Sequence, residues 1–591
     1  MRRRAIAGAL GIWLALALQP AGADGVGARQ VDVLIQGAEV VDGSGAPRYR
    51  ADVAINGDEI VAIGPLADVT AKRVIDARGR IVTPGFIDLH AHVADGESGE
   101  NGMLSPDRRR RAAQNFVMQG VTTTVTNPDG SQPMALPEQR RLLEAKGIGP
   151  NVILLNGHGD MRARAMRGDT KRPANAAEIR AMQEELRRGL AQEGSFGLSL
   201  GTEYEPGRYA STEEQVELAK VLPAYNGIFI PHLRSQGIAP MWYLPSAAGG
   251  VAPPTLDEAV DEVLHVADTT GALVVFTHMK AWGPGYRGEG PRLIRKLQAA
   301  RERGDRVYMD VYPYSSSASD GDFVALPRWA LEPRSPGKHP RLDYKKALRA
   351  TLAAADAKRR EDLERDVLHQ LALKGGPENV RILAFPKASY VGKSYAELMQ
   401  LRGMRAVELA IALQMEGDPY HRGGASMRSF SMDERDIDAF YKLDWCAVST
   451  DGWIVLPEEA VGEKKYVDTN QRNFGTYPRR LAYFSHERGI DTLEHAVRAA
   501  SGLPAKILGL TDRGRLAVGM KADLVVLDLA TLRDTTTDLE PSRYPEGVEH
   551  VLVNGQAVVD GSKPTLALPG KVLWPAGRAL PRSRAANPGS G

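Results

Sequence analysis

Two histidines separated by one residue end a short apolar segment near the start of the chain. Residues 85–92 read Gly-Phe-Ile-Asp-Leu-His-Ala-His. Because alternate side chains of an extended strand point to the same face, His90 and His92 can direct both imidazoles at one point. Two imidazoles at a strand end suit a transition metal such as Zn²⁺. The spacing therefore predicts a metal site at the end of this strand.

Other side chains of the types that bind metals follow further apolar segments. They are Asp129, Glu203, His232, His278 and Asp451. With His90 and His92, the set holds four of the 12 histidines in the chain. A bound divalent ion lowers the pKa of water to about 7 and polarises a carbonyl, and a carboxylate beside it can carry the proton. We therefore predict metal-assisted hydrolysis of an amide or a related bond.

Each of the three carboxylates also has an alternative structural role. Asp129 lies in a Pro-Asp-Gly turn, where Asp often bonds to the local backbone. Asp451 could cap a following helix. Glu203 could accept a hydrogen bond from a ligand instead of binding the metal itself. From the residues alone, both interpretations stay open for all three.

The order of the apolar segments indicates how these side chains are positioned. Eight strand candidates end near His92, Asp129, His158, Tyr204, Arg234, Lys280, Tyr314 and Gly452. Amphipathic stretches that favour helices fall between them, at 174–193, 211–222, 256–268 and 291–303. Strands that alternate with helices form a parallel sheet, and eight such units make a TIM barrel with its active site at the carboxyl ends of the strands. We therefore predict an α/β fold with a TIM-like (β/α)8 barrel over residues 85–504.

The barrel region is longer than eight strand–helix units require. The extra length lies mainly at residues 320–440, after the seventh predicted strand. In it, Lys345–Leu373 reads as one charged amphipathic helix. An insertion at this position predicts a lid over the active-site face.

The two ends of the barrel region are flanked by β-rich segments. Residues 24–84 and 505–576 alternate short β-branched segments with turns, such as the hairpin signal at residues 56–58. Neither part has enough strands to enclose a core, so we predict that both meet in one small β-sandwich. Residues 577–591 are basic and rich in Pro, Ser and Ala, which predicts a disordered tail.

Residues 1–23 have the features of a secretory signal. Three arginines precede an apolar stretch at residues 5–18, and small residues follow at 21–23. Export, together with the single cysteine Cys446 and hence no internal disulfide, predicts a periplasmic protein; an uncleaved anchor is the alternative. Cleavage changes the net charge from +2 to −1, so we expect no nucleic-acid partner. No later segment is long and apolar enough to span a membrane.

Over essentially all of the mature sequence, the chain resembles the N-acyl-D-amino-acid deacylases (D-aminoacylases) of the amidohydrolase superfamily. The resemblance starts at residues 82–92, Val-Thr-Pro-Gly-Phe-Ile-Asp-Leu-His-Ala-His. The other matching segments are residues 120–123, 157–159, 197–204, 232–234, 278–280, 312–314, 449–452 and 472–479. The resemblance implies zinc-dependent hydrolysis of a small molecule, an N-acyl-D-amino acid, to a carboxylate and a free amino acid. The D configuration comes from the resemblance only, and no oligomeric state is predicted.

The resemblance also implies a role for each matching residue. His232 and His278 would hold a tightly bound zinc, and His90, His92 and Asp451 would surround a second, weaker metal position. Asp451 would be the general acid/base. The residues expected to bind the substrate's carboxylate or the developing oxyanion are Lys280, Tyr312 and Arg472, with Tyr204 and Arg234 as further substrate-binding candidates.

The chain departs from the family pattern at two positions. Where the family usually has Asn-Cys-Gly, this chain has Pro128-Asp129-Gly130. A carboxylate is a harder ligand than a thiolate, and Asp129 and Glu203 are both candidates to bridge two metals. Where the family tends to have His-Pro-Arg, residues 470–472 read Asn-Gln-Arg, which suggests a different substrate preference.

Three other functions are compatible with parts of this pattern. A cyclic-amide (hydantoin-like) hydrolase and a dipeptidase could use the same barrel. Many such relatives bridge their metals with a carboxylated lysine, and no lysine stands at the end of the fourth predicted strand. A binding protein without catalysis would be expected to lose metal ligands, whereas only one ligand position is substituted here.

Overall fold

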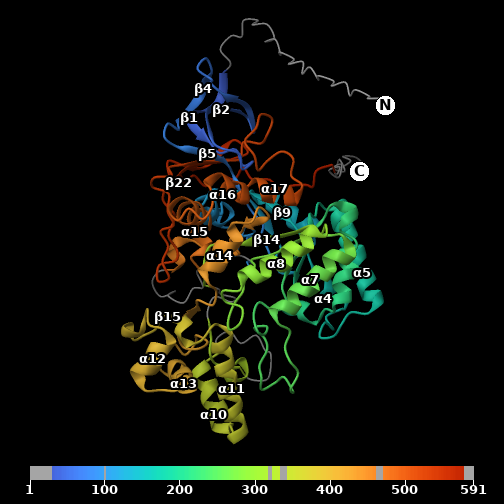
Figure 1. Ribbon diagram of the computed structural model, residues 1–591, viewed down its shortest axis with the longest axis vertical. Helices are drawn as coiled ribbons and strands as arrows, with labels where there is room; N and C mark the ends of the chain where they lie inside the picture. Colours follow the sequence, from blue (N-terminus) through green and yellow to red (C-terminus); the bar gives the residue numbers. More distant parts are fainter. Residues whose placement is uncertain are drawn as a thin grey trace, which may run out of the picture.

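The protein consists of a terminal β-sheet, a central barrel and an inserted lobe, in this order along the long axis of the molecule (Figure 1). This computed structural model describes residues 30–96, 98, 101–316, 323–332, 342–460 and 470–577. The predicted signal at residues 1–23 and nearly all of the predicted tail, from residue 578, lie outside these ranges. No helix within them is both long and apolar enough to cross a bilayer.

The central domain is a ring of eight parallel strand positions. In order, these are β6 (Phe86–Asp88), β8 (Val121–Thr126), β9 (Asn151–Leu154) with β10 (Asn156–Gly157), β11 (Gly197–Gly201), β12 (Ile228–His232), β13 (Leu273–Phe276), β14 (Val307–Val311) and β17 (Cys446–Val448). The ring closes where β18 (Gly452–Trp453) pairs in parallel with β7 (Ala91–His92). The predicted α/β barrel is therefore confirmed.

Alternation along the strands separates the barrel interior from the helix-facing side. Ile228 and Ile230 of β12 belong to one buried cluster with residues of the other strands, whereas Phe229 packs in the larger cluster that includes the surrounding helices. The interior cluster also contains residues of α17 (Gly502–Leu508), which fill the barrel at the end away from the strand carboxyl ends. The polar side chains therefore lie at the carboxyl ends of the barrel strands.

Helices cover the outside of the barrel at the four stretches that the sequence predicted. They are α5 (Ala176–Gln192), α6 (Thr212–Ala219), α7 (Leu256–Thr270) and α8 (Gly290–Glu302). Two of them begin with capping boxes, at Asn175 and Thr255, where the side chain accepts from the backbone and a glutamate three residues later bonds back. Such caps explain why these helices start where they do.

The insertion after β14 forms a lobe with its own hydrophobic core. Its elements are α10 (Tyr344–Ala354), α11 (Ala357–Leu373), α12 (Tyr395–Arg402), α13 (Ala406–Glu416) and the antiparallel pair β15 (Val380–Ala384) and β16 (Ser426–Ser429). The prediction of one helix over Lys345–Leu373 was wrong. Ala355 is extended, with ψ 120°, and the Asp356 carboxylate caps a new helix by accepting from the backbone of Arg359.

Both ends of the described chain meet in one nine-stranded sheet, as predicted. Its strands are β1 (Gln30–Val40), β2 (Tyr49–Asn56), β3 (Glu59–Gly64), β4 (Thr70–Asp76), β5 (Ile81–Pro84), β19 (Leu524–Leu527), β20 (Val548–Val553), β21 (Gln556–Asp560) and β22 (Lys563–Pro564). The two halves join where β5 pairs antiparallel with β19, with Val82 opposite Val526. The hairpin expected at residues 56–58 connects β2 and β3.

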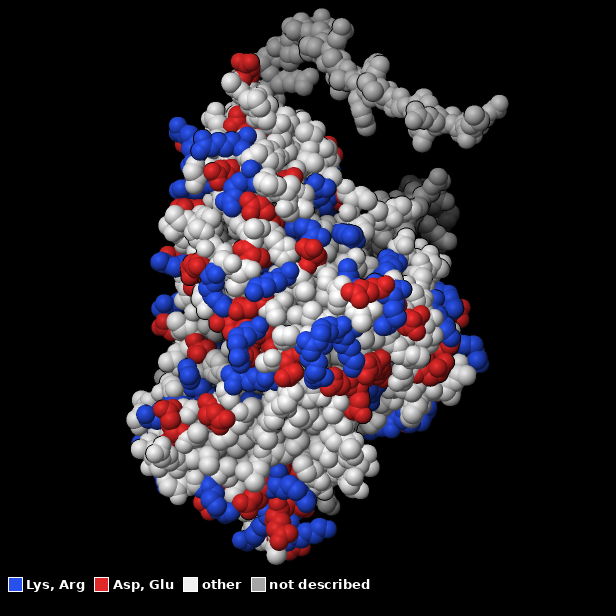
Figure 2. All heavy atoms as spheres, viewed as in Figure 1, with Lys and Arg blue, Asp and Glu red and all other residues white. Residues whose placement is uncertain are grey.

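Charges of both signs are interspersed over the face drawn in Figure 2. That face carries no large field of one sign, which agrees with the nearly neutral net charge.

Candidate active site

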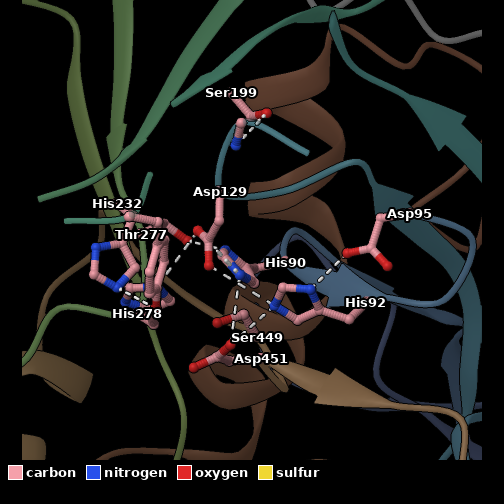
Figure 3. A network of polar contacts seen from close by, with 12 residues as sticks. His90, His92, Asp95, Asp129, Ser199, His232, Thr277, His278, Ser449 and Asp451 are labelled. Carbon is pink, nitrogen blue, oxygen red and sulfur yellow. Dashed lines mark hydrogen bonds and ion pairs between the residues drawn. The ribbon is translucent and has the colours of Figure 1, made fainter. Parts of the chain in front are cut away.

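Two histidines and a carboxylate from opposite ends of the barrel sequence meet at the carboxyl ends of the strands (Figure 3). The Oδ1 atom of Asp451 lies 3.5 Å from Nε2 of His90 and 3.5 Å from Nε2 of His92. All three side chains are buried. Their ligand atoms are close enough together to hold one cation.

Asp129 connects this group to the histidines of the fifth and sixth strands. Its Oδ1 atom lies 3.6 Å from Nε2 of His90 and 3.8 Å from Nε2 of His278. Its Oδ2 atom lies 3.8 Å from Nε2 of His92. The rings of His232 and His278 have centroids 4.7 Å apart. Asp129 thus lies between two groups of imidazoles, where a bridging ligand would have to be (Figure 3).

Glu203 reaches the same region from the loop after β11. Its Oε2 atom lies 3.8 Å from Nε2 of His232, and its Oε1 atom accepts a hydrogen bond of 2.7 Å from the backbone of Met241. One oxygen is therefore held by the backbone and the other is directed at the histidine.

Three of these residues have a backbone conformation that residues other than glycine rarely adopt. Asp129, His278 and Asp451 have φ values of 53°, 33° and 49°. For residues other than glycine this region costs of order 1–3 kcal/mol and is found mainly at functional sites. In each case the turn at the end of the strand directs the side chain into the centre of the barrel mouth.

In three of the histidines, the hydrogen bond of the Nδ1 atom defines the tautomer of the ring. Nδ1 of His92 lies 2.6 Å from a carboxylate oxygen of Asp95, and Nδ1 of His232 lies 2.9 Å from the carbonyl of Leu233. Since these oxygens can only accept, Nδ1 carries the hydrogen. In His90, Nδ1 lies 2.6 Å from Oγ1 of Thr277. That hydroxyl donates to the Asp310 carboxylate, so it accepts from the imidazole. In the neutral form of each ring, Nε2 therefore presents a lone pair.

Burial keeps the imidazoles of His90, His232 and His278 neutral. It is the main cause that lowers the pKa of His232 to about 3, with the positive charge of Lys280 acting in the same direction. Burial likewise lowers the pKa of His90 and of His278 well below the ordinary value. Neutral imidazole is the form that binds a metal.

The donor set fits a divalent cation such as Zn²⁺. The neutral Nε2 atom of His90 faces carboxylate oxygens of Asp129 and Asp451 at 3.6 and 3.5 Å, although neither partner offers a hydrogen to the other. Within the described residues, Nε2 of His90 and Nε2 of His278 have no hydrogen-bond partner. Buried acceptors that face one another require a cation between them, because burial of unpaired polar groups is costly. Imidazole and carboxylate ligands are typical of zinc.

Asp451 differs from the other carboxylates in having two cationic neighbours. Its Oδ2 atom lies 3.3 Å from Nζ of Lys280 and 3.2 Å from a guanidinium nitrogen of Arg472. Burial alone would raise the pKa of Asp451, but the positive charges of Arg472 and Lys280 outweigh it and hold the pKa well below its ordinary value. Asp451 is therefore ionised.

The structure places four of the five predicted substrate-binding side chains around this cluster. Lys280 and Arg472 lie over the ring of Tyr312, with their charged groups 5.2 and 5.0 Å from its centroid. The Tyr204 hydroxyl lies 3.0 Å from Nε2 of His232. Arg234 is different. Its guanidinium is 2.9 Å from Glu262 and also donates to two backbone carbonyls, so it is directed away from the cluster.

Several buried residues that orient the ligands were missed by the sequence analysis. They are Asp95, which contacts His92; Thr277 and Asp310, which support His90; and Asp88, which accepts from the backbone of His90. Asp88 and Asp95 lie close in sequence to the histidine pair and could have been noticed for that reason. Asp310 gives no local signal, because it reaches His90 only through Thr277.

Comparison with known proteins agrees with the fold. Residues 73–227 and 401–559 match the amidohydrolase family, and the chain belongs to this family. It is 31% identical over 574 residues to an N-acyl-D-glutamate deacylase of Alcaligenes xylosoxydans xylosoxydans, across 92% of this chain and 96% of the relative. It is 29% identical over 550 residues to a D-aminoacylase of the same organism, across 89% and 94%.

A solved structure extends this similarity to three dimensions. The N-acyl-D-glutamate deacylase of Bordetella bronchiseptica, complexed with zinc and a phosphonate that mimics the tetrahedral intermediate, superposes with a TM-score of 0.68. The sequence identity is 27%, and the match covers 93% of this chain and all of that chain. This protein is thus a D-aminoacylase-like enzyme of the metal-dependent amidohydrolase superfamily.

Proposed function

We propose that this enzyme hydrolyses the amide bond of N-acyl-D-amino acids, with zinc, to a carboxylate and a free D-amino acid. The observation that carries the proposal is the cluster of buried imidazoles that faces Asp129 and Asp451 at 3.5–3.8 Å. Support for the substrate class comes from relatives that are named N-acyl-D-glutamate deacylase and D-aminoacylase and are similar over nearly their whole length.

The residues that would hold zinc are His232, His278 and Asp129 at one position and His90, His92 and Asp451 at the other, with Glu203 as a further ligand candidate. When bound, zinc supplies Lewis acidity, which polarises the scissile carbonyl and acidifies water. The chain's own contribution is to hold the imidazoles neutral and orient them through Asp95, Thr277 and the backbone of Leu233.

Asp451 is the residue that moves the proton. In the proposal it takes a proton from the attacking water as the new C–O bond forms. As the C–N bond breaks, it passes that proton to the leaving nitrogen, so the amino acid departs as a neutral amine. A substrate carboxylate that pairs with Arg472 or Lys280 would draw these cations away from Asp451. The pKa of Asp451 would then rise, and it would become a better base when substrate is bound.

Lys280, Arg472 and Tyr312 provide the polar surroundings of the reacting carbonyl. Within the described residues, the buried Tyr312 hydroxyl has no hydrogen-bond partner, so it is free to donate to the developing oxyanion. A fixed donor of this kind stabilises the transition state without reorganisation.

The test is to assay the purified protein with added Zn²⁺ against N-acetyl-D- and N-acetyl-L-amino acids, hydantoins and dipeptides. We expect free amino acid to be released from the N-acetyl-D-amino acids, and little from the other compounds. Faster hydrolysis of a hydantoin or a dipeptide would contradict the proposal, as would equal rates for both configurations. Zinc content measured on the same samples shows whether an inactive sample had lost its metal.

A further inference from the structure

A pocket of about 510 Å³ lies between the barrel and the inserted lobe. One wall comes from the loops after β11 and β12, with Glu203, Tyr204 and Trp242. The facing wall comes from the insertion and includes Phe323 and Lys374. Sites of this size bind small molecules.

This pocket opens directly beside the candidate metal cluster. Glu203 and Tyr204 line it and also approach Nε2 of His232, at 3.8 and 3.0 Å. A substrate with its amide at the cluster can therefore extend one substituent into the pocket. That substituent would touch residues of the insertion.

Lys374 is the unusual residue of the pocket. It follows the last residue of α11 and is only 8% exposed. Its ammonium lies 3.4 Å from the ring centroid of Trp282. In the part of the chain that the structure describes, it forms no ion pair. Burial lowers the pKa of Lys374, while the Glu203 carboxylate acts in the opposite direction. A buried cation without a close counter-ion is costly.

The other cations of the pocket are already paired. Arg208 lies 2.5 Å from Glu205, Arg328 lies 3.1 Å from Glu332, and Arg422 lies 3.8 Å from the same Glu332 carboxylate. Each of these arginines therefore has an acidic partner, although Arg328 and Arg422 share one carboxylate. Lys374 is the buried lining cation that a carboxylate from outside could neutralise.

We propose that Lys374 binds a carboxylate in the side chain of the substrate, so that the enzyme prefers N-acyl derivatives of acidic amino acids. This inference rests on the proposed deacylase function. Every N-acyl-amino acid has one α-carboxylate, which the proposed function assigns to Lys280 or Arg472 beside Asp451. Lys374, a further cation on the Glu203 side of the cluster, is placed to bind a second carboxylate of the substrate. Lys374 is thus a specificity-determining residue.

The experiment compares N-acetyl-D-glutamate with N-acetyl-D-glutamine, which has the same shape and the same α-carboxylate but no side-chain charge. N-acetyl-D-leucine serves as an apolar substrate. The variants are Lys374→Met, Lys374→Arg and, as a matched control on the same helix, the exposed Lys358→Met. Circular dichroism and the unfolding temperature establish that each variant is folded.

We expect wild-type kcat/KM to be highest for the glutamate derivative. Since a hydrogen bond to a charged group contributes about 1.5–3 kcal/mol, Lys374→Met should lower this value by about 10- to 100-fold. The loss should appear mainly in KM, with the glutamine derivative changed less than about 3-fold. Lys374→Arg should retain part of the preference, and Lys358→Met should behave as wild type.

Two results with an active enzyme would overturn the inference. An equal loss for the glutamate and glutamine derivatives would mean that Lys374 acts on the α-carboxylate or positions Glu203. A wild-type preference for N-acetyl-D-leucine would mean that the apolar wall of the pocket receives the side chain. Both results leave the deacylase function intact.

A different result would count against the proposed function itself. If zinc-loaded wild type hydrolyses none of the three compounds, calorimetric binding of the glutamate and glutamine derivatives still tests Lys374. Tighter binding of the glutamate derivative that is lost in Lys374→Met supports the anion site. Equal binding of both compounds, or of wild type and variant, refutes it.

Discussion

The carboxylate of Asp451 faces the Nε2 atom of His90 with one oxygen, at 3.5 Å, and turns its other oxygen to Lys280 and Arg472, at 3.3 and 3.2 Å. One side chain thus joins the metal-binding half of the site to its substrate-binding half. This position suits the role of general base and general acid that is proposed for Asp451.

Replacement of Asp451 should therefore affect turnover more than metal content. We expect Asp451→Asn to lower kcat by about 10²- to 10⁴-fold, because general acid–base catalysis contributes about that much. Zinc content, measured by mass spectrometry, should stay mostly intact, since His232, His278 and Asp129 remain. Wild-type turnover in this variant would refute the assigned role. The exposed Asp268→Asn is the control.

His278 should be needed for zinc binding and for the stability that zinc confers. A ligand that binds only the folded state stabilises it by RT ln(1 + [L]/Kd), so zinc should raise the unfolding temperature of wild type. In His278→Ala this rise should disappear, and the zinc bound per chain should fall. The exposed His265→Ala should respond to zinc as wild type does. An unchanged zinc response in His278→Ala would remove this residue from the ligand set.

Asp95 should tune metal affinity through His92. Its carboxylate accepts from Nδ1 of His92 at 2.6 Å, and loss of such a partner typically costs about 10- to 100-fold in metal affinity or activity. Asp95→Ala should weaken binding of the second metal, measured by titration of the metal-free protein, by a factor in this range. Tight binding of the first metal should change little. A loss of both metals would show that Asp95 supports the whole cluster instead.

Substitutions of Arg472 and of Arg234 should have different effects, although both residues lie in segments that resemble those of deacylases. Arg472→Lys should lower kcat/KM by about 10-fold or more, because lysine cannot reproduce a stacked, forked guanidinium. Arg234→Gln should leave kcat/KM within about 3-fold and lower the free energy of unfolding by about 1–3 kcal/mol, because Glu262 loses a charged partner. Chemical denaturation and steady-state kinetics separate the two effects. A large fall in activity for Arg234→Gln would contradict this assignment.

Asp491 should make the stability of the protein depend on pH. Burial would raise its pKa, but hydrogen bonds from His495, Arg480 and Ser485 lower it to about 2. A folded-state pKa below the unfolded value of about 3.9 contributes about 2 kcal/mol at neutral pH. This contribution is present above about pH 4 and is lost as the pH falls towards 2.

The corresponding experiment compares the unfolding of wild type and Asp491→Asn between pH 7 and pH 2. At pH 7 the variant should be less stable by about 2–4 kcal/mol, because the fully buried Arg480 loses its counter-ion. The difference should shrink as the pH falls below about 4. A difference that stays constant over this range would show that the charge of Asp491 does not contribute.

Much of the barrel could be predicted because its signals are local. The strand before His90 ends on two histidines, and each later strand ends on a polar residue that breaks an apolar segment. The helices at 174–193 and 256–268 follow from their apolar periodicity and caps. The break at Ala355 was missed because the amphipathic pattern continues across it, and only the cap at Asp356 marks the new helix.

The sequence by itself determined which residue types stand at the ends of the strands, and with them the class of chemistry. Spacings of two residues and strand–helix alternation are properties of a short stretch of chain, so they can be read there. Only the tertiary structure decided which of these side chains meet. Arg472 reaches Asp451 whereas Arg234 is held by Glu262, and Lys374 comes from the insertion to the edge of the cluster. Such contacts depend on how segments far apart in the sequence pack together, and no local sequence pattern specifies that packing.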